Sequence, residues 1–129
     1  MTLSTRTNPG SLRWSRILIA AVLLELVLFV IAAALYPLPH GETVLLYVIP
    51  PACLAVSTYF GFWAARTAQH RPVLHGALVG IIAAVVYVAL TWKQTLPMVY
   101  VVSHFLKIIG GTLGGAFARR HARPLRGPS

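Results

Sequence analysis

The chain has 129 residues, of which 57% are hydrophobic and only 10% are charged. About one quarter of the residues in an ordinary soluble domain are charged, so this composition favours lipid over water as the solvent. At this length the chain forms one domain at most, and four spanning helices of about 20 residues each would use about 80 residues. We therefore predict an all-α integral membrane protein with four transmembrane helices in a compact bundle.

The net charge is +9, because eleven Lys and Arg stand against two carboxylates, Glu25 and Glu42. In a soluble protein this excess would suggest nucleic acid, but here the basic residues flank apolar runs, where they act as topology signals. We predict no nucleic-acid partner. Cys53 is the single cysteine, which excludes an intrachain disulfide and a cysteine metal cluster. With no Asp, no HExxH and no CxxC, we predict no metal site and no cofactor.

A polar stretch with basic residues, 1–15, precedes the first apolar run and is predicted to be a cytoplasmic tail. Residues 17–35 are the first predicted span, at the start of a transmembrane domain over 16–118. A cleaved signal peptide is the alternative, since arginines precede the run and Ala32 to Ala34 are small. The run is longer than a usual signal-peptide core and carries Glu25 near its middle, so a retained helix is preferred.

Residues 43–65 form the second predicted span, which contains Pro50 and Pro51. This pair is expected to kink the helix and to free backbone carbonyls that neighbouring groups must satisfy. Small side chains recur along one side of the same span, and we expect that side to face inward: Pro50, Cys53, Ser57, Gly61 and Ala64.

The third and fourth predicted spans, 73–91 and 96–118, are rich in glycine, and a basic tail follows them over 119–129. Glycines four residues apart allow another helix backbone to approach closely, so we assign them to helix packing. The glycines concerned are Gly76 and Gly80 in the third span and Gly110, Gly111, Gly114 and Gly115 in the fourth.

The distribution of basic residues predicts the orientation. Nine of the eleven Lys and Arg lie in three places: the N-terminal segment up to and including Arg16, the loop between the second and third spans, and the C-terminal tail. The positive-inside rule then places both termini in the cytoplasm. The basic residues of the C-terminal tail are also expected to contact anionic lipid headgroups, at about 1 kcal/mol each. They are Arg119, Arg120, Arg123 and Arg126.

Three segments carry a resemblance to a known family: R-I-L-I-A-A-V-L-L-E from Arg16, L-H-G-A-L-V-G from Leu74 and L-K-I-I-G-G-T-L-G-G from Leu106. The chain resembles a family of small four-span prokaryotic membrane proteins of unknown function, over residues 16–120. The resemblance implies four spans in an inner, cytoplasmic membrane. It assigns no catalytic residue.

The two ionisable groups deepest in apolar sequence are Glu25 and Lys107. At about 1.5 Å per residue they lie about 14 and 18 Å from the cytoplasmic ends of their helices, measured from Arg16 and Arg119. Because these depths are similar, we predict that the first and fourth helices adjoin and that Glu25 accepts hydrogen bonds from Lys107. His104 lies one turn away and completes a predicted intramembrane polar cluster. Three alternatives are open: the pair fixes helix register without turnover, it takes part in proton or ion movement, or the two side chains make no contact.

Three classes of function remain open. We expect a non-catalytic membrane protein with a structural, assembly or regulatory role, partnered by lipid and by a second copy or another membrane protein. The alternative is a small proton-coupled transporter or channel acting as a dimer, with Glu25 as the titrating group, as in the small multidrug exporters that it superficially resembles. An intramembrane enzyme ranks last, because Ser57, Ser103, His104 and Glu25 do not define a nucleophile, a base and an orienting group.

Overall fold

The computed structural model describes residues 12–68, 70–95 and 97–122, and these ranges contain four α-helices and no strand. All four helices are long and apolar enough to span a membrane. The predicted all-α fold with four candidate spans is therefore confirmed. The helices are α1 (Trp14–Leu35), α2 (Gly41–Ala65), α3 (Pro72–Leu90) and α4 (Met98–His121).

Helix boundaries differ from the predicted spans by up to three residues. α1 begins at Trp14, three residues before the apolar run, and α4 continues through Arg119, Arg120 and His121. Basic side chains are favourable in the last turn of a helix, where the macrodipole is negative. The predicted C-terminal tail therefore starts as helix. Residues 1–11 of the N-terminal tail, and Arg123 and Arg126, lie outside the described residues.

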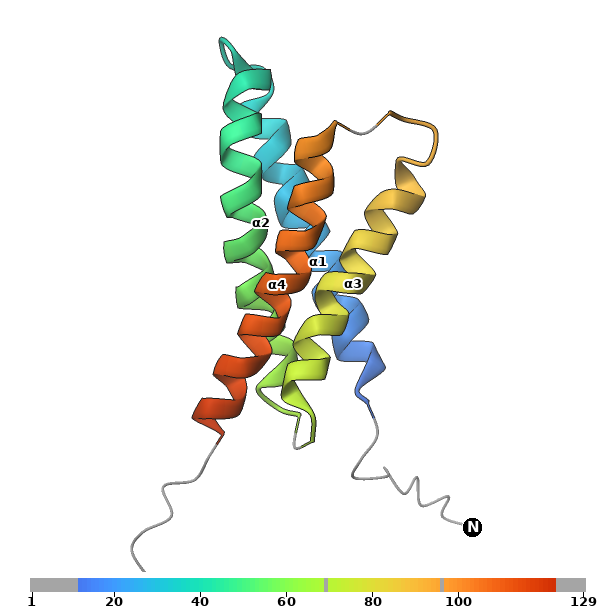
Figure 1. The fold of residues 1–129 in the computed structure, drawn as a ribbon, viewed down its shortest axis with the longest axis vertical. Helices are drawn as coiled ribbons and strands as arrows, with labels where there is room; N and C mark the ends of the chain where they lie inside the picture. Colours follow the sequence, from blue (N-terminus) through green and yellow to red (C-terminus); the bar gives the residue numbers. More distant parts are fainter. Residues whose placement is uncertain (1–11, 69, 96, 123–129) are drawn as a thin grey trace, which may run out of the picture.

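The helices run alternately up and down, so the bundle has two distinct ends (Figure 1). The start of α1, the end of α4 and the α2 to α3 connection meet at one end, which we call the tail end. The connections from α1 to α2 and from α3 to α4 lie at the other, which we call the far end. α2 and α3 occupy the middle of the bundle, since each packs against the other three helices.

Glycines explain why α4 packs against α2 and α3. A Cβ at Gly110 or Gly114 would overlap the backbone of α2, and a Cβ at Gly111 or Gly115 would overlap the backbone of α3. The partner helices also carry glycines at these contacts. Gly61 of α2 and Gly76 of α3 both lie against Gly111. Gly80 of α3 lies against the backbone of Lys107 and Ile108. Two adjacent pairs of glycines on one helix thus admit two different partner backbones.

α1 carries no glycine and is attached at the tail end by two contacts that the sequence analysis did not anticipate. The Arg16 guanidinium donates to the Trp63 carbonyl oxygen at 3.2 Å and lies 4.3 Å above the Trp63 ring centroid. His75 is buried on α3, and its Nε2 accepts a hydrogen bond from the Arg13 backbone N–H at 3.3 Å. Its Nδ1 lies 3.0 Å from the Arg71 carbonyl oxygen. When Nδ1 carries the ring proton, it donates a hydrogen bond to this oxygen and leaves Nε2 free to accept.

α2 runs unbroken through Pro50 and Pro51, and the predicted kink at this point stays a prediction. The inward face expected for this helix is present: Cys53, Ser57, Gly61 and Ala64 are buried, with Pro50 half-buried. On α4 the apolar side opposite the glycines is exposed, as a face directed toward lipid would be; its residues are Val101, Phe105, Ile109 and Leu113.

Candidate functional site

The structure brings Glu25 of α1 and Lys107 of α4 into contact. Lys107 Nζ donates to Glu25 Oε1 at 2.5 Å, and the two side chains are 3% and 16% exposed, Lys107 being the more buried. Hydrogen bonds between an ammonium and a carboxylate are stronger than those between neutral groups, and burial strengthens the attraction. The carboxylate and the ammonium thus neutralise each other in the middle of the bundle.

The helices that carry this pair do not adjoin, and this part of the prediction was wrong. No Cα of α1 lies within 8 Å of a Cα of α4 along the described helices, because the glycines of α4 face α2 and α3 instead. Glu25 and Lys107 reach each other only because both side chains are long. The ion pair therefore crosses a space that backbone packing leaves open.

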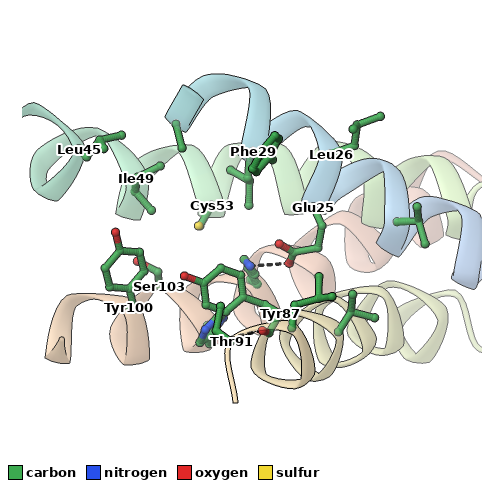
Figure 2. Close-up of a pocket in the computed structure, with 17 residues that line it drawn as sticks. Glu25, Leu26, Phe29, Leu45, Ile49, Cys53, Tyr87, Thr91, Tyr100 and Ser103 are labelled. Carbon is green, nitrogen blue, oxygen red and sulfur yellow. Dashed lines mark hydrogen bonds and ion pairs between the residues drawn. The ribbon is translucent and has the colours of Figure 1, made fainter. Parts of the chain in front are cut away.

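That space is a cavity of about 570 Å³. It is lined by the second half of α1, the first half of α2, the end of α3 and the start of α4, which places it toward the far end. Figure 2 shows Phe29, Leu45 and Ile49 around it, with the Cys53 sulfur directed into it and the ion pair drawn as a dashed line. Most of the described residues that line it are apolar, and among them only Glu25 and Lys107 carry a charge.

A cluster of aromatic side chains lies on the α3 and α4 side of the cavity, and one of them, Tyr87, contacts Lys107. Lys107 Nζ lies 5.0 Å from the ring centroid of Tyr87, within the range of a cation–π interaction. The Tyr87 ring also stacks on Tyr100, with 6.2 Å between centroids, and contacts His104 at 4.7 Å. In Figure 2 the hydroxyl groups of Tyr87 and Tyr100 point into the cavity.

His104 lies beside the pair without bonding to it. Both of its ring nitrogens are buried, and neither has a hydrogen-bond partner among the described residues. The Ser57 and Ser103 hydroxyls donate to carbonyl oxygens in their own helices, those of Leu54 and Val99, at 3.1 and 2.8 Å. Serine hydroxyls within helices commonly bond to the preceding turn in this way. The two serines considered for an enzyme thus bond only within their own helices.

Sequence reasoning missed Tyr87 as a site residue. The sequence did contain a reason to single out Tyr87, because a tyrosine within an apolar span needs a polar partner for its hydroxyl group. Its contact with Lys107 could not be predicted from the sequence, since the contact depends on how α3 and α4 pack. In the part of the chain that the structure describes, no group of three or more His, Cys, Asp or Glu side chains is arranged to hold a metal ion.

Comparison of the chain with protein-family models, with curated proteins and with solved structures gave no significant match. The resemblance to a four-span prokaryotic family therefore stays a prediction. The candidate site consists of one buried ion pair, the aromatic side chains beside it and the cavity that the pair crosses.

Proposed function

We propose that this chain is a non-catalytic integral membrane protein in which the Glu25–Lys107 ion pair fixes α1 against the rest of the bundle. The observation that carries the proposal is the position of the pair, which joins two helices that have no direct backbone packing. Such a bundle suits a structural, assembly or regulatory role, with lipid and a second copy or another membrane protein as partners.

The energetics support a structural use of the pair. A lone charge in the middle of a bilayer costs about 2.5 to 3.5 kcal/mol on insertion scales, and each of these charges offsets the cost of the other. Removing one partner from a buried pair typically costs about 3 to 5 kcal/mol. The same neutralisation opposes transport, because Glu25 must give up Lys107 before it can carry a proton freely.

Topology and location are part of the same proposal. Among the described residues, the basic side chains at the start of α1, in the α2 to α3 connection and at the end of α4 share the tail end, which suits the cytoplasmic face of an inner membrane. Arg119 and Arg120 are exposed in the last turn of α4, where they would reach anionic headgroups. Helix packing through the paired glycines also belongs to the proposed design.

A second candidate function is proton-coupled transport, and the cavity favours it, because Glu25 borders a space wide enough for a small substrate. In this alternative Glu25 titrates and the unit is a dimer, since four helices are few to enclose a pore. The neutralising lysine on α4 is the feature that weakens the comparison with small multidrug exporters.

Proton flux in sealed vesicles tests the two candidates. The purified protein is reconstituted into liposomes with an imposed pH gradient, and the interior pH is followed with a trapped dye. A structural protein predicts the same decay as in protein-free vesicles. Faster decay that Glu25→Gln abolishes would contradict the proposal. Glu42→Gln is the matched control, because Glu42 is an exposed carboxylate in the first turn of α2.

A further inference from the structure

We propose that the cavity beside the ion pair binds a membrane-soluble amphiphile with a hydrocarbon body and an uncharged, hydrogen-bonding head. The hydrocarbon body would lie among the apolar residues of α1 and α2, and the head would contact the polar groups of α3 and α4. This inference concerns ligand binding and goes beyond the structural role proposed above.

The size and lining of the cavity indicate an apolar ligand body. Its volume of about 570 Å³ lies within the range of about 300 to 1,000 Å³ that is usual for small-molecule sites. Leu28, Leu45 and Ile49 are buried core residues that also form part of the wall. Burial of hydrocarbon against such side chains is favourable in proportion to the area covered.

The polar end of the cavity indicates the chemistry of the head. The hydroxyls of Tyr87 and Tyr100 point into the cavity, and each can donate or accept a hydrogen bond (Figure 2). Beside them, Glu25 and Lys107 already balance each other's charge. A charged head would add an unbalanced charge at this depth, whereas a hydroxyl or carbonyl head would only add hydrogen bonds.

The route of entry is lateral, from lipid. Three wall residues of α1 are also largely exposed on the surface of the bundle: Val22 (57%), Leu26 (54%) and Phe29 (70%). On α3, Leu90 borders the same cavity and is 80% exposed. In helices that span a membrane this surface faces the acyl chains, so the wall of the cavity is continuous with the lipid-facing surface between α1 and α3.

Photolabelling tests the proposal with three probes that share one diazirine-bearing alkyl chain. Their heads are a hydroxyl, a carboxylate and a quaternary ammonium. The full chain is reconstituted in phosphatidylcholine vesicles, irradiated and mapped by mass spectrometry. The expected result is saturable labelling by the alcohol at cavity-lining residues, which excess unlabelled alcohol removes. Labelling that does not saturate, or stronger labelling by either charged probe, would overturn the proposal.

Two pairs of variants tie the labelling to the cavity. Ala32 lines it, whereas the neighbouring Ala33 is exposed on the outside of α1. We expect Ala32→Phe to weaken alcohol binding about tenfold, equivalent to about 1.4 kcal/mol, and Ala33→Phe to leave it unchanged. Equal effects of the two substitutions would contradict binding in the cavity.

Tyr100→Phe tests the proposed hydrogen bond between the Tyr100 hydroxyl and the ligand head. The substitution removes one oxygen atom, so the volume of the cavity changes little. Loss of one hydrogen bond predicts weaker alcohol binding by about threefold to tenfold. Tyr59→Phe is the matched control, because Tyr59 is 65% exposed on α2 and does not line the cavity. Melting temperatures of all four variants confirm folding. If Tyr100→Phe binds the alcohol as tightly as the unchanged protein does, the assigned head position is wrong.

Discussion

The tail end and the far end of this bundle are built from the same kind of apolar helix, yet they pack differently. At the tail end, glycines on α2, α3 and α4 bring three backbones into contact, and Arg16 and His75 attach α1 to them. Toward the far end the glycines give way to larger side chains, and the helices surround a cavity of about 570 Å³. The presence or absence of a Cβ at a few positions decides which kind of packing results.

Gly111→Ala should have the larger effect of two substitutions that each add one carbon atom. The new Cβ would overlap the Gly76 backbone, so α3 and α4 would have to separate. Overpacking of this kind costs about 1 to 3 kcal/mol, and a better helix propensity returns at most about 1 kcal/mol. The measurement is the free energy of unfolding in SDS titration of lipid bicelles. An unchanged value would mean that close glycine packing does not stabilise the tail end.

Val86→Leu also adds one carbon, but into the cavity that Val86 lines. Because there is room, the free energy of unfolding should change by no more than about 0.5 kcal/mol. Val85→Leu serves as the control for both substitutions, since Val85 is 61% exposed on the outside of α3. If Val86→Leu destabilises the bundle as much as Gly111→Ala does, the two ends are packed alike and the comparison fails.

Sequence alone predicted the parts of this structure that follow from local patterns. Hydropathy gave four spans to within three residues, and helical periodicity gave the buried face of α2 that contains Cys53, Ser57 and Gly61. Matching depths along two helices also identified Glu25 and Lys107 as groups at the same level, because helix rise is constant.

Features that depend on three-dimensional packing were not predictable in this way. Matching depth does not reveal whether two helices adjoin, and here α1 and α4 do not. The cavity arises from that separation, so its lining, including Tyr87, could not be assigned from any single span. The contacts of Arg16 with Trp63 and of His75 with Arg13 also join residues far apart in sequence, which no local pattern specifies.

The most direct test of the central claim is a double-mutant cycle on the ion pair, with Glu25→Gln, Lys107→Met and both changes together. The free energy of unfolding is measured for each in the same bicelles. If the pair is structural, each single change destabilises by about 3 kcal/mol, because it leaves an unpaired buried charge, and the double change recovers most of that loss. Single changes that have little effect and do not couple would contradict the claim and leave Glu25 free to titrate.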